Sequence, residues 1–397
     1  MVSMKKFYIF FSIALFLSIS FCITCWVVPF QDIFNAQDIV VSKENVENIN
    51  DYGTFVTSKF NKDNSTVDYF LFNAIKLKTV NASVIDKKQV YLGGDAFGFI
   101  YKGNGVLVIG KNVITTDSEL LDNLKNGELQ AGDIICSING ENVKTGLKIS
   151  EVLNEDKNLG GTVEVKAIRK NKEFTTKIKP AYDVLTKKYK LGVWVKDSMS
   201  GIGTLTYVEP DSLRFGALGH ALADSSTNTV LGVDTGNVYD CDILGIKRAS
   251  RGIPGELKGV LHSSKALGKV DKNCESGIFG NFNDNFKLDE ERQLIDIGTR
   301  DTVKPGSAQI YTCLDGKNIR PYNIEIIKTT YQSASNQKNL VFKVTDKRLI
   351  EATGGIVQGM SGSPIVQNGK LIGAVTHVFI NDATKGFGVF IENMLAN

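Results

Sequence analysis

The sequence predicts a mainly β protein that begins with a transmembrane helix and continues into an α+β domain and a larger all-β domain. Three observations lead to this prediction: an uncharged apolar run near the N-terminus, a single short helix-like stretch, and many short apolar runs separated by glycine. The 397 residues are enough for two or three domains, and the hydrophobic content of 42% is ordinary for globular protein. The net charge is +3 and the basic residues are scattered, so no nucleic-acid partner is expected.

Residues 1–30 are predicted to be a signal anchor. The basic pair Lys5-Lys6 precedes the apolar run Phe7–Val28, which is long enough to span a bilayer and is followed by Pro29. Positive charge before the run favours a cytoplasmic N-terminus and export of everything that follows. A cleaved signal peptide is the alternative, although its apolar part is usually shorter and no Ala-x-Ala site ends this run.

Residues 31–87 are predicted to contain a tether and the first strands. The segment Gln31–Ser65 is polar and has little periodicity, so we expect only partial order there. Two strand-like runs follow, Val67–Ile75 and Thr79–Ile85. An exported, partly ordered segment beside an anchor is an accessible place for proteolytic release of the domains that follow, so a cleavage region is expected here.

Residues 88–182 carry the pattern of a small peptide-binding domain. The glycine pair of Tyr91–Gly94 precedes a strand-like segment, and Gly132–Gly140 combines a Gly-Asp turn, a buried strand and an Asn-Gly turn. With the helix-like stretch and the strand Thr162–Arg169 that follow, this order resembles a bacterial PDZ domain. The resemblance implies that Gly93 and Gly94 offer backbone N–H groups to a bound peptide segment. A closed domain whose edge only packs on the rest of the chain is the alternative.

Residues 183–397 are predicted to form an all-β domain, which at about 215 residues is large enough for two small β-barrels. Its clearest element is a hairpin near the C-terminus. The pair Asn368-Gly369 separates the apolar runs Ile365-Val366 and Leu371–Val375, and this pair fits the positive φ angles of a type I′ turn.

A candidate nucleophile, Ser361, lies in the turn GMSGSP that leads into this hairpin. Flanking glycines let the backbone bend sharply and leave N–H groups out of the strand ladder. The N–H groups of Gly359 and Ser361 are therefore candidate donors to an oxyanion. Ser363 is a weaker rival because Pro364 follows it directly, and a turn without chemistry is the other interpretation.

Only three histidines are present, which limits the choice of a general base. His220 follows the small residues of Gly216–Gly219, which allow a partner to approach closely, so it is the candidate base; a structural imidazole is the alternative. His262 is expected on a strand or turn outside the site, and His377 lies on the return strand of the hairpin. Three scattered histidines and the absence of a His-Glu-x-x-His motif predict no metal, and no cofactor motif is present.

The serine hairpin is similar to the nucleophile segment of trypsin-like serine proteases. The tail Thr353–Asn397, together with Gly216–Asp224, resembles the stage IV sporulation protein B peptidases, and the resemblance extends over about residues 68–397. It implies a PDZ domain followed by a trypsin-like double β-barrel and a catalytic triad of Ser361, His220 and Asp346.

The spacing of the implied acid differs from that of trypsin-like enzymes, and the resemblance also implies a set of substrate-binding residues. Asp346 lies only fifteen residues before Ser361, much closer than the acid of trypsin-like enzymes, so Asp224, Asp234 and Asp271 remain rival acids. The return strand is implied to contact substrate, and the candidate substrate-binding residues are Thr376, His377 and Gly355.

The function implied by the resemblance is that of a membrane-anchored, exported serine endopeptidase. Such an enzyme would lie outside the cytoplasm, in the forespore intermembrane space. It would cleave itself and a membrane-embedded regulator of an intramembrane metalloprotease, which leads to late sigma-factor activation in sporulation. Its partners would be those protein substrates, a peptide segment bound by the PDZ domain, and the membrane. A non-catalytic PDZ adaptor with a protease-like binding domain is the alternative.

Overall fold

The computed structural model describes residues 39–42, 56–85, 88–122, 124, 128–289, 291–330 and 338–397. The predicted signal anchor lies outside these residues. Within them, no helix is both long and apolar enough to cross a membrane.

A small sheet precedes the main body. Its strands are β1 (Ile39–Ser42), β2 (Val56–Asn61), β3 (Thr66–Leu71) and β4 (Ile75–Ile85), in the order β1-β4-β3-β2. Strand β2 lies in the segment where only a tether was expected. The first predicted strand ends earlier than expected, because Phe72 and Asn73 adopt positive φ angles of 51° and 57° and turn the chain.

The first barrel is formed by six antiparallel strands whose pairings close into a ring. They are β6 (Ala96–Lys111), β15 (Val193–Val208), β16 (Arg214–Ala217), β19 (Gly277–Phe282), β18 (Glu256–Cys274) and β17 (Thr235–Lys247), which pairs back with β6. Inward-facing apolar side chains fill it, among them Phe99, Leu205, Phe215 and Val270.

The second barrel closes in the same way from the C-terminal strands. They are β21 (Gly306–Cys313), β22 (Ile319–Thr329), β23 (Leu340–Val344), β26 (Asp382–Phe390), β25 (Lys370–Phe379) and β24 (Pro364–Gln367), which pairs back with β21. Helix α3 (Lys347–Thr353) leads into the serine turn, and helix α4 (Ile391–Leu395) ends the chain. The described chain is thus mainly β and contains two closed rings of strands.

Two short strands join the barrels. β5 (Gln89–Leu92) pairs with β15 of the first barrel and with β20 (Leu294–Ile297), and β20 pairs with β25 of the second barrel. Residues of both barrels therefore share one packed region around β5 and β20.

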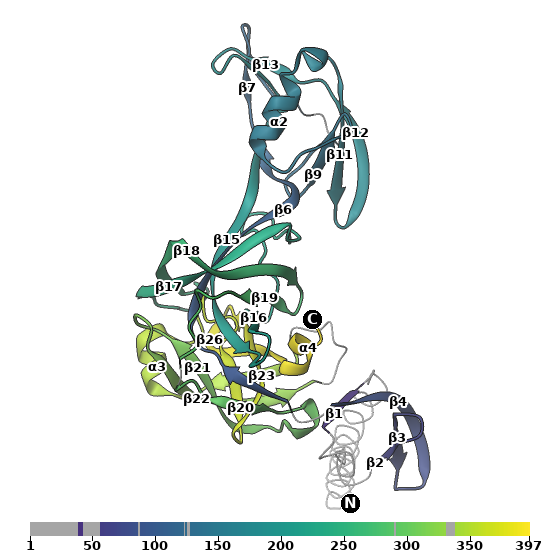
Figure 1. Cartoon of the computed structure of the whole chain (residues 1–397), viewed down its shortest axis with the longest axis vertical. Coiled ribbons are helices and arrows are strands. Elements are labelled where there is room, and N and C mark those ends of the chain that lie inside the picture. The colour runs from purple at the N-terminus through teal and green to yellow at the C-terminus, as the bar shows by residue number, and fades with distance from the viewer. Residues whose placement is uncertain are drawn as a thin grey trace, which may run out of the picture.

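A separate α+β domain is inserted between the first two strands of the first barrel (Figure 1). The outer halves of β6 and β15 run out of the barrel and join it. Between them lie β7 (Ile114–Thr115), β8 (Leu120–Leu121), β9 (Ile134–Ile138), β10 (Glu141–Asn142), α2 (Gly146–Leu153), β11 (Val163–Arg169), β12 (Lys172–Ile178), β13 (Ala181–Asp183) and β14 (Lys188–Lys190). Its own core includes Val106, Ile135, Val152 and Val165.

This arrangement corrects the predicted boundaries of 88–182 and 183–397. The inserted domain spans roughly residues 105–196, and the residues before it belong to the first barrel. The boundary was not visible in the sequence because β6 crosses it as one continuous strand of 16 residues.

The predicted peptide-binding role of Gly93 and Gly94 is corrected by the same observation. Their N–H groups donate to Thr206 O (3.0 Å) and Leu205 O (2.8 Å) of the first barrel. A Cβ on Gly93 would lie 2.2 Å from Leu205 O, so glycine is needed there for close packing of two backbones. These N–H groups are occupied and cannot bind a peptide in the way expected.

Candidate active site

The predicted hairpin that carries the candidate nucleophile is present. Between β24 and β25, Asn368 and Gly369 have φ angles of 50° and 72°, as the type I′ turn requires. The turn that contains Ser361 comes directly before β24, at the open end of the hairpin.

Strand β15 of the first barrel holds this turn in place. Thr204 N–H donates to Ser361 O (2.8 Å), and Thr204 Oγ1 donates to Gly359 O (2.8 Å). Thr206 Oγ1 donates to Gly362 O (2.7 Å). Both threonines are buried, so each bond satisfies a turn carbonyl away from water. The turn is therefore fixed by both barrels.

The predicted oxyanion donors are left free. In the turn, the N–H groups of Met360, Gly362 and Ser363 donate to backbone carbonyls. Across the described residues, no hydrogen bond is made by the N–H groups of Gly359 and Ser361. Two unused donors on a rigid turn are the arrangement that stabilises a developing oxyanion.

The structure distinguishes Ser361 from its rival Ser363. Ser361 is half-buried, and its Oγ donates to Thr376 O at 2.9 Å. Ser363 is fully buried and its Oγ has no hydrogen-bond partner, so it is out of reach of a substrate. No hydrogen bond between Ser361 and a histidine occurs among the described residues. The Ser361 hydroxyl therefore has to rotate away from Thr376 before a base takes its proton.

The His220 segment meets the serine turn at β25. After β16 the chain turns through Leu218 and Gly219, whose φ angles are 66° and 68°. A Cβ on Gly219 would lie 3.1 Å from Thr376 Cγ2, and a Cβ on Gly362 would lie 2.5 Å from Leu218 N. Because both glycines lack a side chain, the two segments approach closely and bring His220 and Ser361 to the same end of β25.

His220 is held in the tautomer that a general base needs. Its Nδ1 lies 2.8 Å from Ala221 O. Since a carbonyl oxygen only accepts, Nδ1 carries the proton and Nε2 keeps its lone pair. Burial lowers the pKa of His220, and the hydrogen bond to Ala221 O offsets this only in part. The imidazole is therefore neutral at pH 7 and ready to accept a proton.

His377 lies against His220. The two ring centroids are 4.9 Å apart with planes inclined by 35°, and His377 Nδ1 is buried without a partner. Burial is the main cause that lowers the pKa of His377 to about 4, and repulsion from a charged His220 and from Lys338 adds to it. His377 therefore stays neutral when His220 becomes charged.

The side chain of the expected triad acid, Asp346, is engaged at the start of helix α3. Its side chain caps helix α3 by accepting from Arg348 N–H (3.0 Å), pairs with the Arg348 guanidinium and accepts from Asn323 N–H (3.2 Å). These partners lower the pKa of Asp346 to about 2. Among the described residues, no hydrogen bond or ion pair joins it to His220. Matching by position in the sequence missed that a cap residue is needed where this helix begins.

The rival acids are also engaged elsewhere. Asp224 binds Lys196, Ser226 and Thr227, Asp234 pairs with Lys144, and Asp271 accepts from Asn281. The described residues contain one histidine–carboxylate pair, His262 Nε2 with Asp242 at 2.9 Å, and it lies on an exposed part of the first barrel. Within the described chain, the third position beside the imidazole is filled by the Ala221 carbonyl and the ring of His377.

The predicted substrate-binding residues lie on or beside an open edge of β25. Pairing with β24 ends at Ala374, and Val375 is still bonded to the serine turn, because its N–H donates to Ser363 O (2.9 Å) and its carbonyl accepts from Gly362 N–H (2.8 Å). The residues from Thr376 to Val378 have β26 on one side and, within the described chain, no strand on the other. Thr376 and His377 belong to this edge, next to Ser361. Gly355 is buried against β26, where a Cβ would lie 2.1 Å from Ala383 O, so it contributes backbone only.

Sequence reasoning missed the two threonines of β15 and the Ala221 carbonyl. Thr204 and Thr206 alternate with apolar residues in Ile202–Val208, and two buried hydroxyls on one face of a strand need acceptors. That pattern was visible, but their acceptors lie about 155 residues away in the chain. A backbone carbonyl such as Ala221 O leaves no trace in residue type.

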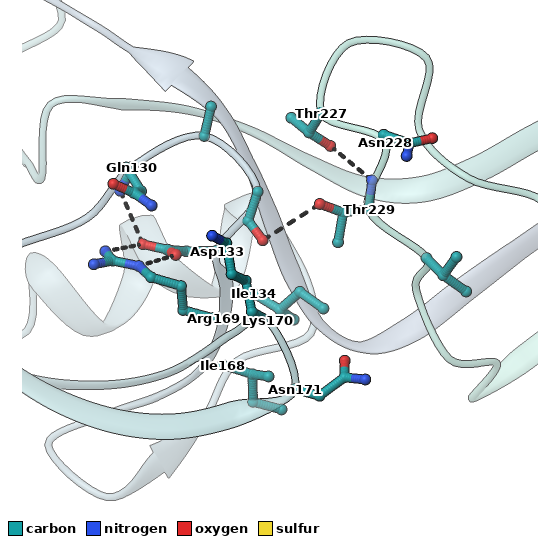
Figure 2. A pocket seen from close by; sticks show the side chains of 13 residues that line it. Gln130, Asp133, Ile134, Ile168, Arg169, Lys170, Asn171, Thr227, Asn228 and Thr229 are labelled. Carbon is teal, nitrogen blue, oxygen red and sulfur yellow. Dashed lines mark hydrogen bonds and ion pairs between the residues drawn. The ribbon is translucent and has the colours of Figure 1, made fainter.

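The loop that follows the His220 segment contacts the inserted domain. Thr229 Oγ1 donates to Gly132 O (3.4 Å), and Lys144 pairs with Asp234 (2.8 Å). A cavity of about 380 Å³ lies at this junction, and Figure 2 shows Lys170 and Asn171 of the inserted domain facing it opposite the loop. The inserted domain therefore supports the loop that continues from the base.

Known proteins were compared with this chain. The profile of the family described as SpoIVB peptidase S55 matches residues 187–395, just over half of the chain. "Serine protease Do-like HtrA" of Bacillus subtilis (strain 168) is 45% identical over 51 residues, which is 13% of this chain and 11% of that protein. The chain thus matches about a ninth of the length of that relative.

Among solved structures, the active form of the Rv3671c protease from M. tuberculosis is similar with 13% identity and a TM-score of 0.27. The match covers 50% of this chain and 74% of that one. An inactive mutant form of the same protein gives 14% identity and a TM-score of 0.26, covering 49% and 80%.

Proposed function

This chain belongs to the SpoIVB peptidase S55 family and is a serine endopeptidase, and we propose that Ser361 is its nucleophile and His220 its general base. The free N–H groups of Gly359 and Ser361, on a turn that meets the His220 segment, carry this proposal. His220 Nε2 takes the proton of Ser361 Oγ as it attacks a peptide carbonyl, and returns a proton to the leaving amine.

The substrate chain is proposed to add to the open edge of β25 beside Thr376 and His377. This edge faces no strand on its outer side within the described chain, so an extended segment can lie along its backbone and recognition there depends little on side-chain type. Displacing the Ser361 hydroxyl from Thr376 O is then part of substrate binding.

The biological role is proposed from the same family membership. The chain is anchored by residues 1–30, exported, and acts outside the cytoplasm in sporulation signalling. It cleaves itself between anchor and barrels, and it cleaves a membrane-embedded regulator of an intramembrane metalloprotease, which leads to late sigma-factor activation. The inserted domain acts as a PDZ module for a peptide segment of a partner, without using Gly93 and Gly94. Its order of elements from β9 through α2 to β11 supports this role.

Labelling with a fluorophosphonate probe, mapped by mass spectrometry, tests the nucleophile. We expect modification of Ser361, and a loss of peptidase activity of about 10⁴-fold or more in Ser361→Ala. Ser363→Ala is the matched control, because its hydroxyl is buried two residues away and should label like the wild type. Equal self-cleavage in folded Ser361→Ala would instead support the non-catalytic adaptor.

A further inference from the structure

A cavity of about 400 Å³ lies beside the oxyanion turn, between the two barrels. Its lining comes from three segments: β15, the start of β18, and the two residues Gln358 and Gly359. Gly359 belongs both to this lining and to the pair of free N–H donors. A group in the cavity is therefore next to the carbonyl that Ser361 attacks.

The walls of the cavity are fixed by backbone pairing. Leu257 N–H donates to Gln358 O (2.8 Å), and Gln358 N–H donates to Gly255 O (2.9 Å). A Cβ on Gly359 would lie 3.0 Å from Leu257 Cβ, so the turn and β18 are in close contact. The cavity exists before any substrate binds, which lowers the entropy cost of recognition.

The position of the cavity assigns it to one side of the scissile bond. The open edge of β25, where the substrate chain is proposed to pair, lies on the Thr376 side of Ser361, and the acyl part is assigned to it here. The cavity lies on the Gly359 side, against β18. An extended substrate that crosses Ser361 places its two parts on opposite sides, so the leaving part faces the cavity.

The cavity is lined by apolar side chains and by one carboxylate. Ile202, Leu257 and Leu261 are apolar and pack against the core of the second barrel. Glu256 is exposed, and within the described residues its carboxylate has no hydrogen bond or ion pair. Aliphatic walls with one unpaired carboxylate suit a long side chain that has an apolar stem and a cationic end.

We propose that this cavity is the subsite for the first residue of the leaving part, and that it prefers lysine or arginine. The inference rests on the proposed function of Ser361. The stem of the side chain contacts Ile202 and Leu261, and its cation pairs with Glu256. Selection by this subsite acts on which bond is cut, in addition to recognition along β25.

Acyl transfer measures this subsite directly. The full-length protein reacts with a p-nitrophenyl ester of a blocked peptide: Ser361 Oγ gives its proton to His220 and bonds to the carbonyl carbon, the ester C–O bond breaks, and nitrophenolate leaves. His220 releases the proton to solvent, so it is neutral again when the acyl enzyme has formed. An added amino-acid amide then attacks that ester; its amine loses a proton to His220, an amide bond forms, and Ser361 regains its hydroxyl. The ratio of peptide product to hydrolysed acid reports how well the amide occupies the leaving-group side.

Arginine amide and citrulline amide form a matched pair of acceptors, since they have nearly the same shape and differ in charge. We expect arginine amide to be used about threefold to fivefold better, the range for one partly exposed ion pair. Glu256→Gln should bring the ratio close to one. Glu325→Gln, an exposed carboxylate on β22 outside the lining, should leave it unchanged. Ser200→Trp places a large ring in the cavity and should lower the use of both acceptors.

The outcomes separate the two proposals. A burst of nitrophenolate that depends on Ser361, with equal use of both amides or an unchanged ratio in Glu256→Gln, overturns the subsite and leaves the nucleophile in place. Absence of that burst overturns the proposed function and the subsite with it.

Discussion

Ser361 lies in a turn whose carbonyls are bonded to Thr204 and Thr206 and whose other N–H groups pair within the second barrel. His220, by contrast, has one side-chain hydrogen bond among the described residues, to Ala221 O. The nucleophile is thus positioned by many backbone contacts from both barrels. The base is positioned by close packing against β25 and by the ring of His377. The oxyanion turn is therefore the more strongly preorganised part of the site. The imidazole of His220 is held by fewer contacts.

The contact between the serine turn and the first barrel is most sensitive to substitution at Gly362. Its φ angle is 95°, and a Cβ there would lie 2.0 Å from Thr204 O. We expect Gly362→Ala to destabilise the protein by about 2–5 kcal/mol through backbone strain and overpacking. Turnover should fall by about 10²-fold or more, because the oxyanion turn is displaced from β15. Urea unfolding and ester hydrolysis measure the two effects.

Gly369→Ala is the matched control. Gly369 lies in the same hairpin and has a φ angle of 72°, but a Cβ there meets nothing within 4 Å. It should cost only the strain of a left-handed residue, about 1–2 kcal/mol, with near-normal turnover. Equal effects of the two substitutions would show that the contact with the first barrel does not position the turn.

The same contrast explains what was predictable from the sequence. The hairpin and the serine turn depend on neighbours in the chain, so Asn368-Gly369 and the glycines around Ser361 revealed them. The surroundings of His220 depend on Thr376 and His377, more than 150 residues later, and on a backbone carbonyl. Residue type carries no record of such contacts.

The domain boundaries predicted from the sequence differ from those in the structure for a related reason. β6 continues as one strand of 16 residues while it leaves the first barrel and enters the inserted domain. A strand that serves two cores gives no boundary signal, so Gly93 and Gly94 were assigned to the wrong core.

The histidine pair His220 and His377 is expected to make the stability of the protein depend on pH in mild acid. The pKa of His377 is about 4 in the folded protein and about 6.5 when unfolded, so the unfolded chain binds the extra proton between these values. Stability should therefore fall as pH drops from 6.5 towards 4, and the lowered pKa of His220 adds to the loss. The full shift corresponds to about 3.4 kcal/mol. Since the imidazole is partly exposed and solvent screens it, we expect about 1–2 kcal/mol for His377 across this window. Denaturant midpoints at several pH values measure it.

His377→Phe separates this effect from general acid denaturation. Phenylalanine keeps a ring beside His220 but cannot take a proton, so the stability of this variant should depend less on pH between 6.5 and 4. The carboxylate of Asp346, with a pKa of about 2, loses its stabilising charge only below this window and does not confuse the comparison. An unchanged slope would mean that His377 is solvated in the folded protein.

Substitutions of Asp346 are expected to have the smallest effect on turnover. They also test whether its carboxylate serves the helix before the serine turn or the imidazole of His220. Its contacts assign it to the helix that leads into the oxyanion turn, whereas its place in the family pattern assigns it to the imidazole. Asp346→Ser keeps an N-cap acceptor, so we expect turnover within about threefold of the wild type and little loss of stability. Asp346→Ala lacks the cap and should lose about 1 kcal/mol. If the carboxylate instead acted on His220, serine would fail as badly as alanine, and both would lower turnover by about 10⁴-fold. Turnover of the two variants, measured on the same ester, therefore decides whether the third partner of the imidazole is a carboxylate or the carbonyl of Ala221.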